Sequence, residues 1–258
     1  MPSSLSIASG KGGVGKTTLA INLAVMQAKT SKCLLLDADM GMANAHILLG
    51  LNPNLTIKDF FDGSCSLEKV ITKGPEDLKF ISGGTGVTEL LKIEKNKKLN
   101  FIRTFDQISN SIDHLIVDVS AGAEDSSLSL LSASDKILVV LINEPTSFTD
   151  AFTLIKVCHL DFGLKEFCLA VNMVKHELQG KEIFKKFSQI MKKFYDVNIT
   201  YVGSIPENNK IKRSVIHKKP LILDKNNKEF SLLFERMIKN INTAPNNKFN
   251  GIKFFNNS

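Results

Sequence analysis

Short apolar runs alternate along the chain with longer segments in which apolar residues recur at helical spacing. The apolar runs predict β-strands, because buried strands of a parallel sheet are almost continuously hydrophobic; they occupy residues 5–9, 33–36, 78–82, 114–118, 136–142, 167–173 and 200–205. The helical segments occupy residues 16–29, 97–111, 147–159, 177–194 and 229–241. This alternation predicts an α/β fold with a mostly parallel, twisted sheet and helices on both faces.

The chain has 258 residues, of which 43% are hydrophobic, so one large core can form. No apolar run reaches the ~18 residues of a membrane span, and the N-terminus has no signal-peptide features. The four cysteines are scattered without a C-x-x-C pair, which argues against a metal cluster or a disulfide framework. We therefore expect a cytoplasmic protein with reduced thiols, one domain over residues 1–241, and a basic tail over residues 242–258.

The charge is distributed unevenly. Residues 1–174 contain 16 basic and 19 acidic residues, whereas residues 175–258 contain 17 basic and 7 acidic residues. A basic terminal third favours an anionic partner, either nucleic acid or a membrane surface. A solvated surface in a chain rich in Lys and Asn explains the same asymmetry, so both interpretations stay open.

A glycine-rich segment, GKGGVGKTT, follows the first predicted strand and opens the first predicted helix. It satisfies G-x-x-x-x-G-K-[ST], the phosphate loop of a single-domain P-loop NTPase fold, in which backbone N–H groups and a helix N-terminus face phosphate. Lys16 would bridge the β- and γ-phosphates, Thr17 would ligate Mg²⁺, and Thr18 would donate to the α-phosphate. The predicted nucleotide-binding residues of the loop are Gly10, Lys11, Gly12, Gly13, Val14, Gly15, Lys16, Thr17 and Thr18.

Carboxylates end two predicted strands, at the edge where open α/β sheets bind ligands. Asp37 suits a Mg²⁺-bound water, and Asp39 suits the orientation of an attacking water. Asp118 ends the apolar run LIVD, a Walker B pattern, and would lie in the outer shell of Mg²⁺. An ordinary carboxylate is a weak base at neutral pH, so we expect Asp39 to act by position and hydrolysis to be slow.

Lys11 follows the first glycine of the loop, and the full box GKGGVGKTT therefore resembles the deviant Walker A box of the MinD/ParA family of dimerising P-loop ATPases. The resemblance implies a sandwich homodimer with ATP, in which Lys11 reaches the partner's nucleotide as an arginine finger would. It gives Lys11, Lys16 and Asp39 catalytic roles. The segment VSAG resembles the family's second switch, where the Gly122 amide would sense the γ-phosphate; members usually have Pro or Gly where this chain has Ser120.

The base-binding residues are also implied by this resemblance. Asn172 ends the run LAVNM, where the family places an asparagine that hydrogen-bonds adenine. Pro206 and Glu207 lie in GSIPE, which resembles the family's G-x-I-P-x-[DE] segment beside the base. The guanine-specific motif NKxD does not follow, so ATP is expected in preference to GTP.

Three stretches resemble the FlhG branch of the family, also called FleN or YlxH: DADMGMANAHILLGL at 37–51, LKFISGGTG at 78–86 and NEPTSFTDAFTLIK at 143–156. This implies a regulator of flagellar number or placement that works with the flagellar GTPase FlhF and with switch-ring components. Nine residues precede Gly10, so we do not expect the N-terminal helix with which FlhG proteins activate FlhF. A ParA-type DNA or cargo partitioning ATPase and a MinD-type division-site ATPase remain the alternatives.

The basic tail contains apolar residues at helical spacing. Phe249, Ile252 and Phe255 could share one face, flanked by Lys248 and Lys253. MinD and FlhG relatives use such a C-terminal helix at the membrane, which predicts contact with anionic lipid at the inner face of the cytoplasmic membrane. A disordered tail is the alternative.

Overall fold

The computed structural model describes residues 1–39, 44–83, 95–248 and 251–255, with the backbone alone described for residues 95–98. Within these residues one sheet has the strand order β3-β4-β2-β5-β1-β6-β7-β8. Adjacent strands are parallel except for the pair β3–β4, which confirms the predicted mostly parallel sheet. The strands are β1 (Ser3–Ala8), β2 (Cys33–Ala38), β3 (Thr72–Lys73), β4 (Lys79–Ser82), β5 (His114–Val119), β6 (Lys136–Leu141), β7 (Glu166–Val174) and β8 (Asn198–Pro206).

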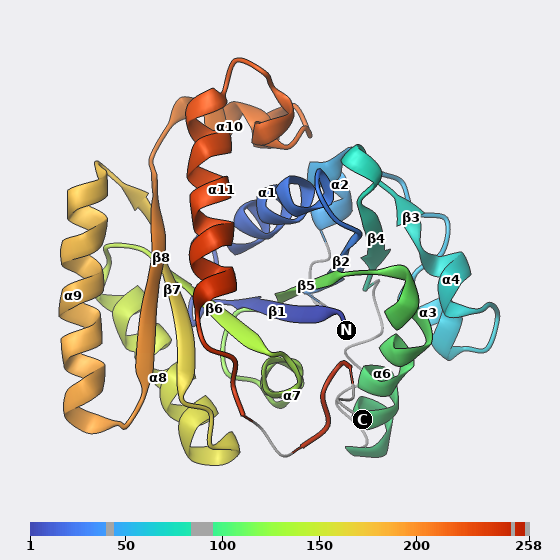
Figure 1. Cartoon of the computed structure of the whole chain (residues 1–258), viewed down its shortest axis with the longest axis horizontal. Coiled ribbons are helices and arrows are strands. Elements are labelled where there is room, and N and C mark those ends of the chain that lie inside the picture. Colours follow the sequence, from blue (N-terminus) through green and yellow to red (C-terminus); the bar gives the residue numbers. More distant parts are fainter. Residues whose placement is uncertain (40–43, 84–94, 249–250, 256–258) are drawn as a thin grey trace.

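Helices cover both faces of the sheet (Figure 1). One core lies under α1 (Lys16–Ala28), α2 (Ala45–Leu49) and α11 (Lys228–Thr243), and the other under α6 (Lys95–Thr104), α7 (Asp125–Ala133), α8 (Pro145–Phe162) and α9 (Glu177–Phe194). Neighbouring strand residues point to opposite cores, as Leu34 and Leu35 do. The remaining α-helices described are α3 (Ile57–Phe61), α4 (Leu67–Val70) and α10 (Asn209–Ile216).

The predicted helices differ from the structure mainly where patterns are short. The predicted helix at 97–111 is α6 followed by a 3₁₀ segment, Phe105–Ser111. Three single-turn helices, α2 to α4, were not predicted, because so few residues carry no readable period. α7 and α10 were also missed: α7 is serine-rich, and α10 has no fully buried residue to mark an inner face.

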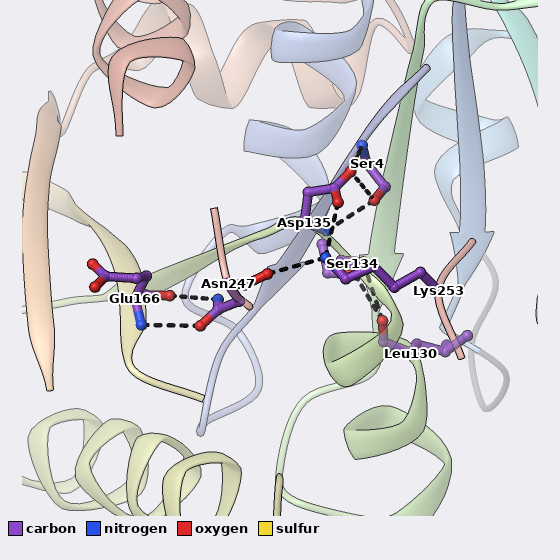
Figure 2. A network of polar contacts seen from close by, with 8 residues as sticks. Ser4, Leu130, Ser134, Asp135, Glu166, Asn247 and Lys253 are labelled. Carbon is purple, nitrogen blue, oxygen red and sulfur yellow. Dashed lines mark hydrogen bonds and ion pairs between the residues drawn. The ribbon is translucent and has the colours of Figure 1, made fainter. Parts of the chain in front are cut away.

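The tail predicted at 242–258 is fastened across the amino ends of the strands (Figure 2). Asn247 Nδ2 donates to the carbonyl of Glu166 (2.7 Å), and Asn247 Oδ1 accepts from the Glu166 amide (3.0 Å). Lys253 Nζ lies 3.1 Å from Asp135 Oδ1, while Asp135 Oδ2 accepts from the amide and the hydroxyl of Ser4 (2.9 and 2.8 Å). The tail thereby joins the starts of β1, β6 and β7.

The apolar residues of this segment enter the core. Phe254 is fully buried with its ring edge-on to Phe105, at 5.3 Å between centroids, and Phe255 is 6% exposed. Residues 251–255 are not helical, and Phe249 lies outside the described residues. The expectation of an exposed apolar face that includes Phe255 is therefore wrong for this structure, because the side chain fills the core instead. The domain boundary at residue 241 stays a prediction.

Among the described helices, none combines the length and the apolar character needed to cross a membrane.

Candidate functional site

The phosphate loop joins β1 to α1 and is held from two sides. Gly13 and Gly15 have left-handed φ angles of 79° and 85°. A Cβ atom on Gly15 would lie 2.3 Å from Asn172 Nδ2, and one on Gly10 would lie 2.1 Å from the main-chain carbonyl carbon of Asp150 in α8. Only glycine fits at these two contacts, so packing against β7 and α8 fixes the loop's path.

Three buried charged side chains meet where the loop faces the carboxyl ends of β2 and β5. Asp37 and Asp118 are paired in register across these strands, and both are fully buried. Lys16 is 6% exposed, and its Nζ donates to Asp118 Oδ1 at 2.7 Å. Asp118 Oδ2 is also buried and has no hydrogen-bond partner among the described residues. The cluster therefore has one more buried negative group than its single lysine can pair.

This imbalance changes the acidity of both carboxyl groups. Burial, and secondarily the charge of Asp118, raises the pKa of Asp37 to about 7. Burial also raises the pKa of Asp118, although the Lys16 ammonium and the Thr17 hydroxyl oppose the rise. A cation beside the two carboxyl groups would favour their ionised forms.

The donor set fits Mg²⁺. Two carboxyl groups and the Thr17 hydroxyl supply hard oxygen donors, and the unpartnered Asp118 Oδ2 offers a free acceptor. In the described part of the chain, no group of three or more His, Cys, Asp or Glu side chains could hold a metal alone. Mg²⁺ usually keeps several waters and takes its other ligands from substrate phosphate, which suits an incomplete set of this kind.

Hydrogen bonds hold the carboxylates at the end of β2 and join Asp39 to the segment VSAG at 119–122, which resembles the family's second switch. The Asp37 carboxylate accepts from the amides of Asp39 (3.3 Å) and Ala45 (3.0 Å). The Ser120 hydroxyl lies 3.2 Å from Asp39 Oδ1. The Gly122 amide, which was expected to sense phosphate, donates to the Ser9 carbonyl at 2.9 Å. That amide must therefore exchange partners before it can contact a nucleotide.

Lys11 is bound within its own chain. Its Nζ lies 2.5 Å from Glu144 Oε2 and 3.1 Å from Thr146 Oγ1, at the start of α8. The side chains of Lys11 and Glu144 are 36% and 49% exposed, so the pair lies at the protein surface. Lys11 is thus the exposed lysine of the loop, whereas Lys16 is buried.

A cavity of about 340 Å³ opens beside the loop, where the base was expected. Its lining includes Asn172, Pro206 and Glu207, the three residues predicted to surround the base. Gly15, Thr18, Met173 and apolar side chains of α10 also line it. Asn172 Nδ2 donates to the Val14 carbonyl at 2.7 Å, so this amide also supports the loop. Its second N–H remains for a base.

Three residues at the site were not predicted to act there. Glu144 and Thr146 lie within the stretch 143–156. The resemblance of this stretch to the FlhG branch was the sequence feature that could have pointed to them. Ser120 was noted as a departure from the family pattern, but its contact with Asp39 could not be read from the sequence. Part of the stretches at 37–51 and 78–86, namely residues 40–43 and 84–86, lies outside the described residues.

A family model described as ParA, NUBPL iron-transfer P-loop NTPase, matches residues 1–242. The chain belongs to the ParA family of P-loop NTPases. The matched residues run from β1 into the last turn of α11 and include the loop, the strand-end carboxylates and the cavity. The family expected from the deviant Walker A resemblance is therefore confirmed.

Two relatives of this ParA-family protein have the names FleN and YlxH, which are names of the expected branch. The antiactivator FleN of Pseudomonas aeruginosa is 34% identical over 242 residues, which are 93% of this chain and 86% of FleN. The flagellum site-determining protein YlxH of Helicobacter pylori is 29% identical over 219 residues, 84% of this chain and 74% of YlxH. A chain of the MinC:MinD cell division protein complex of Aquifex aeolicus has a TM-score of 0.72 at 28% identity, covering 92% of this chain and 95% of that chain.

The four cysteines of this ParA-family protein are free thiols in the structure. Cys33, Cys158 and Cys168 are buried, and Cys65 is partly buried. Burial raises the pKa of the Cys158 and Cys168 thiols to about 12, so neither forms a thiolate readily at neutral pH.

Proposed function

We propose that this protein is an ATP-binding, slowly hydrolysing dimerisation switch that regulates flagellar number or placement. The observation that carries the proposal is the geometry of the phosphate loop, in which Lys11 pairs with Glu144 at the surface and Lys16 pairs with the buried Asp118. The likeness to FleN and YlxH supports the flagellar role.

Each residue of the buried cluster has a task in the proposed reaction. Lys16 exchanges Asp118 for the β- and γ-phosphates, and Thr18 donates to the α-phosphate. Thr17 would hold Mg²⁺, with Asp37 and Asp118 contacting it through water, and the ion would neutralise phosphate charge. Asp39 orients the attacking water. The adenine would occupy the cavity lined by Asn172, Pro206 and Glu207.

Dimerisation follows from the second lysine. Lys11 leaves Glu144 and Thr146 and reaches the phosphate of a second copy of the chain, where it neutralises charge in the transition state. The exposed ion pair that it leaves contributes little stability, so a charged phosphate can displace it. The Gly122 amide exchanges the Ser9 carbonyl for the γ-phosphate and so reports whether ATP or ADP is bound.

Imaging of flagella tests the biological role. Deletion of the gene should change flagellar number or position, and a wild-type copy should restore it, whereas a Lys11→Ala copy should not. FlhF and switch-ring components are the partners to test by ATP-dependent co-purification. Unchanged flagella together with defective DNA segregation or misplaced division sites would favour the ParA-type or MinD-type alternative.

The basic terminal third is the feature of the chain that is compatible with the DNA-partitioning alternative. Residues 175–258 contain 17 basic residues against 7 acidic ones. Retention of the ATP-bound protein on DNA, falling steeply as salt increases, would favour that alternative over the flagellar one.

Contact with an anionic membrane is a separate part of the proposal. A lipid contact through Phe255 requires the tail to detach, because that side chain is buried and Lys253 is paired with Asp135. Binding to anionic liposomes should then depend on ATP and on residues 242–258.

A further inference from the structure

Ser120 lies in the segment VSAG at 119–122, and its hydroxyl faces the end of β2. It directly follows β5, and its side chain is half-buried. Its hydroxyl lies 3.2 Å from Asp39 Oδ1 and 3.3 Å from the carbonyl oxygen of Ala38, both at the end of β2. Among the described residues, no other side chain is hydrogen-bonded to the Asp39 carboxylate.

The main chain around Ser120 is anchored independently of that hydroxyl. Its carbonyl accepts from the Ser127 hydroxyl in α7 at 3.4 Å, and the amide of Gly122 donates to the Ser9 carbonyl at 2.9 Å. With ATP bound, the Gly122 amide would hold the γ-phosphate instead of Ser9, so in either state contacts other than the Ser120 hydroxyl hold the segment.

The chemistry of the hydroxyl suits a carboxylate that must be held in one orientation. A serine hydroxyl has one proton to donate, and here two acceptors lie within reach of it. When it donates to Asp39, the carboxylate is held beside β5. A carboxylate has two oxygens, so Asp39 Oδ2 remains available to an attacking water while Oδ1 accepts from Ser120.

We propose that Ser120 is a positioning residue for ATP hydrolysis, whose hydroxyl holds the Asp39 carboxylate in the orientation from which it aligns the attacking water. This inference rests on the proposed ATPase function of Asp39. The hydroxyl does not touch the nucleotide in this account, so it affects the rate of hydrolysis and leaves nucleotide affinity alone.

Steady-state kinetics of Ser120→Ala, with Ser120→Thr and Ser129→Ala as matched variants, test the proposal. Loss of one hydrogen bond to a charged group should lower kcat about tenfold to 100-fold, with KM and the affinity for a non-hydrolysable ATP analogue within about twofold. Ser120→Thr keeps the hydroxyl and should retain most of kcat. Ser129→Ala removes a hydroxyl that bonds only within α7, to the Asp125 carbonyl, and should hydrolyse like wild type.

A double-mutant cycle separates this inference from the proposed function. In the Asp39→Ala background, Ser120→Ala should cause no further loss of kcat, because the group it positions is gone. An equal loss in both backgrounds, or a wild-type kcat for Ser120→Ala, would overturn the role of Ser120. If Asp39→Ala itself hydrolyses ATP like wild type, the proposed function fails instead.

Discussion

Two charge clusters, one fully buried and one partly buried, lie at opposite edges of the same sheet and are built differently. At the carboxyl ends, Lys16 lies beside the fully buried Asp37 and Asp118, and Asp118 Oδ2 has no partner. At the amino ends, Lys253 pairs with Asp135, whose second oxygen accepts two hydrogen bonds from Ser4. The first cluster has an unpaired acceptor and excess negative charge, whereas the second pairs its charges.

The two clusters differ in what they contribute: the first suits ligand binding, and the second stabilises the fold. A buried carboxylate without a partner destabilises the folded state, and it persists where a ligand completes it. A fully paired network stabilises the fold and leaves nothing for a ligand to bind. We therefore assign nucleotide chemistry to the carboxyl ends and the fastening of the C-terminal segment to the amino ends.

The largest effect should come from replacing Lys16, compared with replacing Lys253, the lysine of the other cluster. Lys16→Ala should lower affinity for ATP at least about 100-fold, because charge-assisted hydrogen bonds to phosphate are lost. Lys253→Ala, the matched control, should leave ATP affinity unchanged. Calorimetric titration with ATP and Mg²⁺ measures both; equal losses in the two variants would erase the distinction between the clusters.

The next effect concerns the stability of the paired network. Asp135→Ala removes the partner of Lys253 and of Ser4, so the free energy of unfolding should fall by about 2–3 kcal/mol, with ATP affinity unchanged. Denaturant unfolding monitored by circular dichroism measures the loss. The same variant should bind anionic liposomes better than wild type if the tail is a lipid anchor, and no better if the tail is only structural.

Replacing Asp37 should change the free energy of unfolding by a smaller amount and should raise it. Its folded pKa of about 7 lies above the ordinary 3.8, so the folded protein holds a proton that the unfolded chain loses as pH rises from about 4 to 7. The free energy of unfolding should therefore fall across that window. Asp37→Asn should flatten this dependence and raise stability at pH 8 by about 2 kcal/mol, measured without nucleotide in EDTA. A variant less stable than wild type at pH 8 would contradict the unpaired-charge account.

The smallest effect is expected at the exposed pair of the loop. Glu144→Gln releases Lys11 from an ion pair worth at most about 1 kcal/mol, so the ATP concentration for half-maximal dimerisation should fall about twofold to fivefold. Glu177→Gln breaks a comparably exposed pair with Lys181 and should change nothing. Equilibrium sedimentation over a range of ATP concentrations measures the shift, and a rise in the required ATP would contradict the resting role of Glu144.

The carboxyl-end cluster was largely predictable from sequence because its signals are local. The loop is a run of nine consecutive residues, and Asp37 and Asp118 each end an apolar strand, which brings them to one edge of a parallel sheet. What could not be predicted is which carboxylates pair with the two lysines of the loop. The pairing of Lys11 with Glu144 joins residues 133 positions apart, which no local pattern encodes.

The amino-end cluster was not predictable for the same physical reason. Lys253 and Asp135 are 118 positions apart, and Asn247 contacts the main chain of Glu166 without belonging to any motif. The spacing of Phe249, Ile252 and Phe255 suggested a helix, but Phe254 and Phe255 gain more by filling the core beside Phe105 than by facing water. The conformation of this segment therefore follows from burial against residues distant in the sequence, and local spacing does not determine it.

The central claim is that ATP joins two copies of the chain through Lys11. Its most direct test is the molar mass in solution, by light scattering, with Mg²⁺ and either no nucleotide, ADP or a non-hydrolysable ATP analogue. We predict a monomer with ADP or without nucleotide, a dimer with the analogue, and a Lys11→Ala variant that binds the analogue with unchanged affinity and stays monomeric. A wild-type protein that remains monomeric when saturated with the analogue, or a Lys11→Ala variant that dimerises as wild type does, would contradict the account.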